Sequence, residues 1–290
     1  MKKQSLLIIG SKGQLGTDMV LLSKQAGYNV SEIDFPDIDI TDPQMTQQCI
    51  LKFKPDFIIN CAAYTAVDNC ETHQQQAFAV NAKGVQNIAV SAKKIDAVLI
   101  HISTDYVFDG KKTSPYLEDD KASPQTVYGK SKLEGEELIA SHCDKFQIFR
   151  IAWLYGIHGN NFVKTIRSIA HKKMLENQPL TVVNDQFGTP TYTREVCAQV
   201  LKMIDQPHYG IFHSTNEGFC TWYDFASEIV KAAGIDVQLL PCTTEAFPRP
   251  APRPLYSVLE NAHLKKLDLN IMKNWKEAFQ SFLIDELKCK

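Results

Sequence analysis

The first half of this 290-residue chain alternates short apolar runs with amphipathic segments, which limits the folds that it can adopt. Runs of apolar residues bounded by turn residues are typical of buried strands, and a period near 3.6 is typical of helices. We expect strands at 6–9, 28–33, 57–60, 97–102 and 146–151, and helices at 14–26, 43–53, 74–94 and after residue 127. Strands that alternate with helices predict an α/β fold with a doubly wound parallel sheet.

Charge and composition exclude several classes of protein. The net charge of −2 gives no basic surface for nucleic acid, and no apolar run is long enough to cross a bilayer. The apolar run that follows Met1–Lys3 is too short for a signal peptide and ends in a glycine-rich turn, so we interpret it as the first strand. The eight cysteines form no Cys-x-x-Cys pair, and we expect reduced thiols in a cytoplasmic protein that holds no metal through them.

A glycine-rich turn follows the first expected strand. Its sequence fits G-x-x-G-x-x-G between a strand and a helix: Gly10, Ser11, Lys12, Gly13, Gln14, Leu15 and Gly16. Such glycines permit a tight turn and let backbone amides approach a pyrophosphate, which the helix N-terminus also attracts. The context predicts a Rossmann-type dinucleotide site, although an ordinary strand-to-helix turn is the alternative.

The residues after the second strand bear on the choice of dinucleotide. Asp34 lies where an acidic side chain holds the ribose hydroxyls of adenosine, which favours NADH. Lys12 favours NADPH, because its ammonium suits a 2′-phosphate. Asp39 and Ile40 are candidates to lie beside the adenine. We expect NADPH with NADH as the alternative.

The most informative pair for chemistry is Tyr128 and Lys132, which open an expected helix. Residues four apart share a helix face. An ammonium near a phenol favours the phenolate and lowers the pKa of the tyrosine, which then exchanges a proton with a carbonyl or alcohol oxygen. Thr104 follows the fourth strand, where its hydroxyl meets a substrate at the carboxyl edge of the sheet or else caps a turn.

Several motifs together resemble the extended short-chain dehydrogenase/reductases and, more narrowly, the family of dTDP-4-dehydrorhamnose reductases. The resemblance spans nearly the whole chain. It rests on the glycine-rich turn, on Tyr128-x-x-x-Lys132 and on the segments 60–65, 103–110, 150–155, 159–162, 185–191 and 253–257. One departure is Cys61, where the family often has alanine. The resemblance implies reduction of the C4 keto group of dTDP-4-dehydro-L-rhamnose to dTDP-L-rhamnose, a precursor of cell-surface polysaccharide.

The resemblance also implies roles for individual residues. Thr104, Tyr128 and Lys132 would form the catalytic triad, with Tyr128 as proton donor. The dinucleotide would be lined by Gly13, Gln14, Leu15, Asp34, Asp39, Ile40, Ala62, Ala63 and Tyr64. Asp105 and Trp153 would touch the sugar. Some relatives dimerise through Mg²⁺ held by glutamates. Asp18 stands near one such position without clear partners, so a Mg²⁺ site and the choice between monomer and homodimer stay open.

A nucleotide-sugar substrate also needs groups that hold its base and its diphosphate. Trp153 or Phe162 could stack on a ring, with Asn161 and Gln186 as amide partners. Arg253 suits the pyrophosphate, because a guanidinium fork matches phosphate oxygens. Both aromatic residues could instead belong to a plain core.

The second half of the chain is less regular. Residues 179–193 are rich in loop formers, 241–254 hold five prolines, and helices are expected at 192–205, 222–233 and 274–287. We expect residues 1–153 to form a dinucleotide-binding domain, to which elements from about 185–213 return. Residues 154–290 would form mainly a smaller substrate-binding lobe. Two alternatives are another nucleotide-sugar reductase or epimerase of the same fold, and a non-catalytic regulatory subunit that binds the dinucleotide.

Overall fold

The alternating pattern folds into a six-stranded sheet in which all neighbouring strands are parallel. The structure is a computed structural model that describes residues 4–289, so the basic start at Met1–Lys3 lies outside it. Across the sheet the strands are β10 (Gly210–His213), β5 (Phe146–Ile151), β4 (Val98–Thr104), β3 (Phe57–Asn60), β1 (Ser5–Ile9) and β2 (Asn29–Ile33). The predicted doubly wound α/β fold is confirmed.

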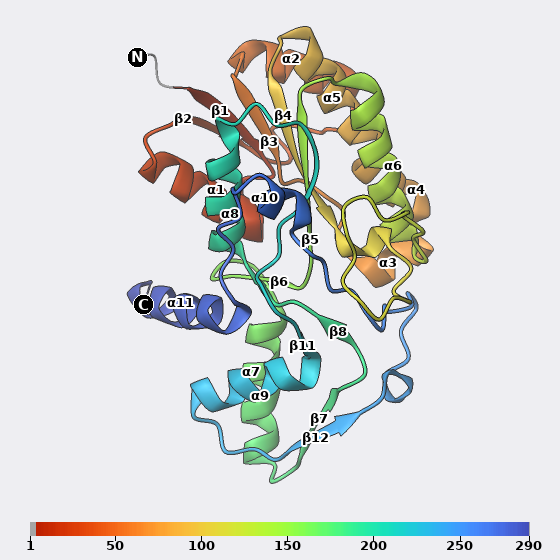
Figure 1. Cartoon of the computed structure of the whole chain (residues 1–290), viewed down its shortest axis with the longest axis vertical. Helices are drawn as coiled ribbons and strands as arrows, with labels where there is room; N and C mark the ends of the chain where they lie inside the picture. Colours follow the sequence, from red (N-terminus) through yellow and green to blue (C-terminus); the bar gives the residue numbers. More distant parts are fainter. Residues whose placement is uncertain (1–3, 290) are drawn as a thin grey trace.

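Helices cover both faces of this sheet (Figure 1). One face carries α1 (Gln14–Gln25) and α8 (Thr193–Ile204); the other carries α2 (Pro43–Phe53), α5 (Val85–Lys94) and α6 (Val127–His142). Along β1 the side chains alternate between the two faces. Leu6 and Ile8 pack with α1 and α8, whereas Leu7 and Ile9 pack with α2, α5 and α6. Burial on both faces explains why the strand is an unbroken apolar run.

The long helix expected at 74–94 is divided in the structure. After α3 (Val67–Thr72) the chain forms α4 (Gln74–Phe78), a π-helical turn (Ala79–Gly84) and then α5. The π turn places Asn81 so that its amide accepts from Tyr64 N, donates to Tyr64 O and donates to Ser131 Oγ. This buried amide ties the loop after β3 to α6. Single π turns inside helices are frequent at functional sites.

A second lobe contains a further group of helices and three short strand pairs. Its core packs around α7 (Phe162–Leu175), α9 (Trp222–Ala233) and α11 (Trp275–Lys288), and the sequence pattern did not predict α7. The strand pairs are β6 (Leu154–Tyr155) with β9 (Thr191–Tyr192), β7 (Leu180–Val183) with β12 (Leu239–Cys242), and β8 (Phe187–Gly188) with β11 (Cys220–Thr221). Figure 1 shows α7, α9, β7 and β12 at the end of the molecule away from the sheet.

Late segments of the chain also pack on the first lobe. Helix α8 lies against α1, β10 pairs with β5, and α10 (Ala262–Lys266) contacts β10. Within residues 4–289 no helix is both long and apolar enough to cross a membrane.

A buried ion pair joins α6 to the sheet. Arg150 on β5 donates from Nη2 to Oε2 of Glu136 at 2.6 Å, and the two side chains are only 4% and 2% exposed. Ser103 on β4 donates to the same carboxylate, and the guanidinium lies over the ring of Phe108. Helix α6 carries Tyr128 and Lys132, so this ion pair bears on where both side chains lie.

We expect Glu136→Gln to destabilise the fold strongly, because the neutral amide leaves the buried guanidinium of Arg150 without a counter-charge. Removing one partner of a buried pair costs about 3–5 kcal/mol of the free energy of unfolding. Urea unfolding followed by circular dichroism measures the loss. The control is Glu32→Gln, which breaks the half-exposed pair with Lys24 and should cost less than about 1 kcal/mol. Equal losses in the two variants would contradict the role given to Glu136.

Candidate active site

The site lies where the direction of the chain across the sheet reverses. From β1 the chain crosses to β2 on one side and then to β3 on the other, so β1 and β3 flank the switch point. Ligands of open parallel sheets bind at such a point, beside the carboxyl ends of the strands. The turn from Gly10 to Gly16 follows β1, and the segment Cys61–Tyr64 follows β3.

The glycines of this turn fit a dinucleotide pyrophosphate. Gly10 has φ +78°, and a Cβ there would overlap the backbone of Ala62. A Cβ on Gly16 would overlap the carbonyl oxygen of Gly10, whereas one on Gly13 would only approach that oxygen to 3.3 Å. The turn is therefore packed closely against the loop after β3, with its amides and the N-terminus of α1 at the switch point.

Asp34 holds the glycine-rich turn from the end of β2. Its carboxylate accepts from the backbone N–H of Lys12 and of Phe35, each at 2.7 Å. Lys12 itself is exposed and Ser11 is buried. Asp34 thus orders the loop that would meet an adenosine ribose, whichever of the two dinucleotides binds.

Three other residues assigned to the cofactor have structural partners of their own. Leu15 and Ile40 are each 6% exposed and pack in the two cores of the sheet, so only their backbones are available to a ligand. Asp39 accepts from the backbone N–H and hydroxyl of Thr41. Ala62, Ala63 and Tyr64 are all partly exposed at the switch point.

Thr104 lies at the carboxyl end of β4, as expected, and it also caps a turn. Its hydroxyl donates to Asp105 Oδ1 at 2.9 Å and accepts from Tyr106 N at 3.2 Å, at the start of a 3-10 turn (Asp105–Val107). Thr126 caps α6 by accepting from Gly129 N at 3.0 Å. These two caps bring the hydroxyl groups of Thr104 and Tyr128 near each other.

The expected lowering of the pKa of Tyr128 is wrong for this structure. Burial raises the pKa of the phenol above 10, and the nearby hydroxyl of Thr104 only partly opposes this. The reason is that the ammonium group expected to act on the phenol has other partners. Lys132 Nζ contacts His101 Nε2 at 3.0 Å and donates to the carbonyl of Ile102 at 2.6 Å. Tyr128 therefore stays a neutral phenol at physiological pH.

Lys132 itself is only 1% exposed. Burial lowers the pKa of its amine to about 8, against the opposing charges of Glu136 and Cys61. A lysine buried this deeply needs hydrogen-bond partners within the protein, because water cannot solvate its amine.

Asp105 is the second perturbed group of the site. Burial raises the pKa of its carboxyl to about 6, partly opposed by the hydrogen bond that Oδ1 accepts from Thr104. Its Oδ2 has no partner among residues 4–289. Burying a carboxylate oxygen without a partner costs stability, and such an oxygen can accept a hydrogen bond from a hydroxyl or amine of a ligand.

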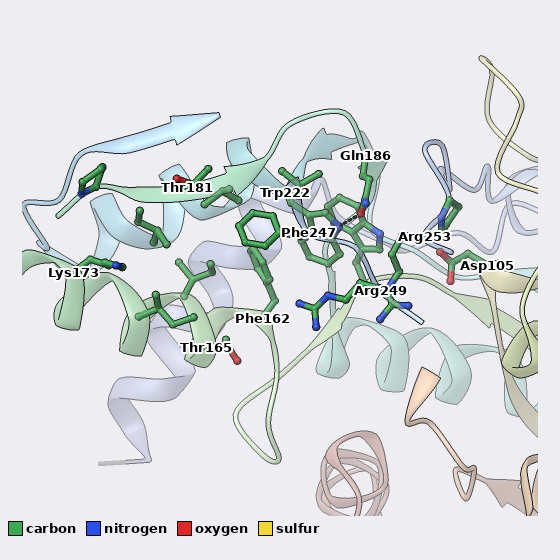
Figure 2. A pocket seen from close by; sticks show the side chains of 18 of the residues that line it. Asp105, Phe162, Thr165, Lys173, Thr181, Gln186, Trp222, Phe247, Arg249 and Arg253 are labelled. Atoms are coloured by element: carbon green, nitrogen blue, oxygen red, sulfur yellow. Dashed lines mark hydrogen bonds between the residues drawn. The ribbon is translucent and has the colours of Figure 1, made fainter. Parts of the chain in front are cut away.

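A cavity of about 820 Å³ begins at Asp105 and runs into the second lobe (Figure 2). Five residues predicted to bind substrate line it, namely Asp105, Trp153, Phe162, Gln186 and Arg253. Its far end lies between α7 and β7, lined by Lys173 and Thr181. Cavities of this size and mixed lining are typical of sites for small organic ligands.

A pair of stacked indoles forms the aromatic wall of this cavity. Trp153 and Trp222 lie parallel with ring centroids 3.4 Å apart, and Phe162 packs on Trp222 at 4.4 Å. Trp153 has φ +46°, a strained backbone for a bulky residue. Gly188 makes the stack possible, because a Cβ there would overlap the indole of Trp153.

The other polar residues predicted to bind substrate have protein partners. Gln186 accepts from Trp222 Nε1 at 3.1 Å and donates to Thr244 Oγ1, so it orients the aromatic wall. Arg253 forms a two-pronged pair with Asp68, with both N···O distances 2.8 Å. A diphosphate would therefore meet a guanidinium already ordered by a carboxylate.

Asn161 lies elsewhere than predicted. It caps α7 by accepting from Lys164 N, and its amide donates to Gln14 Oε1 at 2.9 Å and to Gly156 O. It is not among the residues that line the cavity. Asn161 thus links the glycine-rich turn to the second lobe, which is a structural role that the sequence did not reveal.

The surroundings of Asp18 bear on the open question of a metal. Its buried carboxylate accepts from Thr193 Oγ1 at 2.5 Å and pairs with Arg194 at 3.3 Å. Arg194 also pairs with Asp285 at 3.1 Å. Within residues 4–289, no three acidic, histidine or cysteine side chains gather as a metal site. The guanidinium of Arg194 thus pairs with both of these carboxylates.

Sequence reasoning missed several residues of the site. Trp222, Phe247 and Arg249 line the cavity, and Asn60 and His101 lie behind Lys132. Trp222 follows the capping residue Thr221, which predicts a helix start but no ligand contact. His101 belongs to the strand expected at 97–102, and nothing in a strand pattern shows which lysine packs against it.

Comparison with known proteins agrees with this geometry. The family model for the RmlD substrate binding domain matches residues 4–288. The spore coat polysaccharide biosynthesis protein SpsK of Bacillus subtilis is 40% identical, over 96% of each chain.

Two solved structures are similar over nearly the whole chain. A dTDP-4-dehydrorhamnose reductase from Clostridium acetobutylicum is 46% identical, with a TM-score of 0.94, covering 98% of this chain and 99% of its own. A dTDP-4-dehydrorhamnose reductase from Bacillus anthracis, in complex with NADP, is 37% identical with a TM-score of 0.93 and the same coverage. This chain therefore belongs to the RmlD family, the family of dTDP-4-dehydrorhamnose reductases.

Proposed function

We propose that this protein reduces the C4 keto group of dTDP-4-dehydro-L-rhamnose with NADPH, and that Tyr128 donates the proton. The observation that carries the proposal is the position of Asp105. It is hydrogen-bonded to Thr104 and lies at one end of the cavity in the second lobe. The cavity thus leads from the carboxyl end of β4, beside Thr104, into a part of the second lobe that can hold a nucleotide.

The cofactor, when bound, supplies the hydride. Thr104 would hydrogen-bond the keto oxygen, and the neutral phenol of Tyr128 would give that oxygen its proton. Because burial raises the pKa of Tyr128, the phenol stays protonated until the oxygen becomes basic. The unpartnered Oδ2 of Asp105 would accept from a sugar hydroxyl beside the reacting carbon.

The nucleotide end of the substrate would lie in the second lobe. The stack of Trp153 and Trp222, with Phe162, offers an apolar wall for a base or a sugar ring. Arg249 and Arg253 both line the cavity, and Figure 2 shows them between the aromatic wall and Asp105. Two guanidinium groups at this position suit a diphosphate.

The positions of the glycine-rich turn and of the cavity suggest which lobe binds the dinucleotide and which binds the substrate. We propose residues 1–153 as the dinucleotide-binding part, with α8 and β10 added to it, and the rest mainly as the substrate lobe. We further propose a cytoplasmic enzyme, monomeric or homodimeric, that makes a precursor of cell-surface polysaccharide and binds no nucleic acid or membrane. Size-exclusion chromatography with light scattering would establish the oligomeric state.

The reaction is tested by following NADPH oxidation at the nicotinamide absorbance, in parallel with NADH. The substrate is dTDP-4-dehydro-6-deoxy-glucose together with the 3,5-epimerase that converts it. We expect oxidation that requires both the epimerase and this protein, and that is faster with NADPH. Dinucleotide binding without any oxidation would favour the regulatory-subunit alternative. Tightly retained NAD that is released on denaturation would favour an epimerase.

Replacing the proton donor should separate chemistry from binding. We expect Tyr128→Phe to lower kcat by about 10²–10⁴-fold, the range for loss of a positioned general acid. NADPH affinity, measured by fluorescence titration, should stay close to that of the unsubstituted protein. Tyr209→Phe is the matched control, because Tyr209 is 45% exposed at the edge of β10. Turnover by Tyr128→Phe equal to that of the control would remove Tyr128 from the mechanism.

Asp105 should show a conflict between stability and function. Its pKa of about 6 in the folded protein lies above the ordinary value of 3.8 for an aspartate. The stability that its protonated form contributes is therefore complete below about pH 4 and is lost as pH rises through 6. Asp105→Asn does not ionise, so its stability relative to the unsubstituted protein should rise across this window, by up to about 3 kcal/mol. Urea unfolding at several pH values measures this difference.

The same variant should lose activity, because an amide presents a different set of donors and acceptors to the sugar. We expect kcat/KM to fall at least about tenfold, a loss of 1.4 kcal/mol in transition-state binding. Stability curves that run parallel from pH 4 to 7 would contradict the raised pKa of Asp105. Unchanged kcat/KM would remove its contact with the substrate.

A further inference from the structure

A buried hydrogen-bond chain ends at Lys132. It runs from the backbone N–H of Ala62 through Asn60 and His101 to Lys132 Nζ. Asn60, His101 and Lys132 are 1%, 0% and 1% exposed. Because no bulk water reaches these groups, each contact needs one donor and one acceptor.

The backbone fixes the direction of the first bond. Ala62 N–H can only donate, and it lies 3.1 Å from the amide oxygen of Asn60. The other atom of the same amide is therefore Nδ2, which faces His101 Nδ1 at 3.1 Å. An NH₂ group can only donate, so His101 Nδ1 accepts.

The direction of the second bond follows. Burial holds the pKa of His101 well below 6.5, so the ring is neutral and carries one proton. With Nδ1 accepting, that proton is on Nε2. Nε2–H thus points at Lys132 Nζ, 3.0 Å away.

An ammonium group has no lone pair with which to accept this hydrogen. We infer that Lys132 is a neutral amine in the free protein, that its lone pair accepts from His101 Nε2–H, and that His101 is the positioning residue that sets this state. One amine hydrogen is donated to the carbonyl of Ile102 at 2.6 Å. The second hydrogen is left for a ligand hydroxyl.

The charged alternative requires a rearrangement of buried groups. For the ammonium to donate to Nε2, His101 must carry its proton on Nδ1, and Asn60 must turn its oxygen toward the ring. Asn60 would then present its NH₂ to the N–H of Ala62, and two buried donors would face each other. Ala62 lies against Gly10, so the loop cannot move aside freely.

Burial and nearby charges alone would leave Lys132 mainly an ammonium at pH 7, so the neutral state rests on the hydrogen bond from His101. Glu136, four residues on in α6, and Cys61, after β3, both favour the ammonium form. The carboxylate of Glu136 is already paired with Arg150 and bonded by Ser103. Burial outweighs both groups and lowers the pKa of Lys132 to about 8. The hydrogen bond from His101 acts in the same direction.

A neutral Lys132 has a consequence for the proposed reaction. Without an ammonium nearby, the phenol of Tyr128 keeps its proton, which is the form needed to protonate a keto oxygen. The charge state of Lys132 in the free protein does not depend on which ketone is reduced, so it can be tested separately from the proposed function.

Nitrogen NMR of the cofactor-free protein tests the inference directly, because it shows which ring nitrogen of His101 carries the proton. Two-bond ¹H–¹⁵N spectra of histidine-labelled protein distinguish the two neutral tautomers and the imidazolium. We expect His101 to carry its proton on Nε2 from about pH 6 to 9, with no imidazolium form. A proton on Nδ1 would overturn the inference, and this measurement needs no variant.

The charge on Lys132 is measured from its ¹³Cε shift during a pH titration. We expect half-protonation below pH 8 in the unsubstituted protein. In His101→Gln the midpoint should rise by at least about one unit, a tenfold gain in proton affinity, because the Gln amide can offer its oxygen to an ammonium. His213→Gln is the control, since His213 is also 0% exposed and lies on β10 with its ring bonded to Glu260 O.

The two variants separate a positioning role from a general loss of packing. We expect His213→Gln to leave the Lys132 midpoint unchanged, whatever it does to stability. An unchanged midpoint in His101→Gln, or an equal rise in both variants, would overturn the role of His101. In the reductase assay, kcat should begin to fall at a lower alkaline pH in His101→Gln. The reason is that a charged Lys132 lowers the pKa of Tyr128, so the proton donor is lost at lower pH.

Discussion

The close seating of α6 on the sheet is the constraint on which the site depends. Two glycines of this helix leave no room for a side chain, because a Cβ on Gly129 would overlap Tyr106 O and one on Gly135 would overlap Asn81 O. Two polar contacts complete the seating, from Glu136 to Arg150 and from Lys132 to Ile102 O. The positions of Tyr128 and Lys132 relative to β4 thus follow from backbone contact and buried charge, not from surface packing.

The two lobes meet at residues that serve structure and site at once. Asn161 caps α7 and also binds Gln14 in the glycine-rich turn. Arg253, in the proline-rich loop, is paired with Asp68 at the start of α3. These contacts place the cavity of the second lobe against the carboxyl ends of β1 and β4. The placement explains how residues more than a hundred positions apart come to share one site.

Sequence patterns predicted the parts of this structure that local chemistry decides. The apolar runs and caps gave every strand of the sheet except β10, and the bounds of α1, α2, α8, α9 and α11 to within a residue or two. The pattern gave no sign of α7, and it missed the π turn because nothing local distinguishes it from a helix. The turn places Asn81 in contact with the loop after β3 and with α6, and both segments are distant from it in sequence.

The same limit applies to the site. Motif resemblance and the expected chemistry of the substrate named five of the residues that line the cavity, but side-chain partners are set by tertiary contacts. Gln186 orients Trp222, and Asn161 caps a helix that the pattern did not predict. The pKa of Tyr128 was misjudged for this reason. Helical spacing places Lys132 one turn from the phenol, yet cannot show that His101 and Ile102 O surround the amine.

The raised pKa of Tyr128 bears on the direction of the chemistry. An epimerase of this fold must first oxidise its substrate, and for that the tyrosine has to act as a base, as a phenolate. A reductase needs the opposite form, because its tyrosine gives a proton away. Burial of Tyr128 and the partners of Lys132 both favour the phenol. The electrostatics of the site thus suit the step in which Tyr128 protonates the oxygen of a ketone.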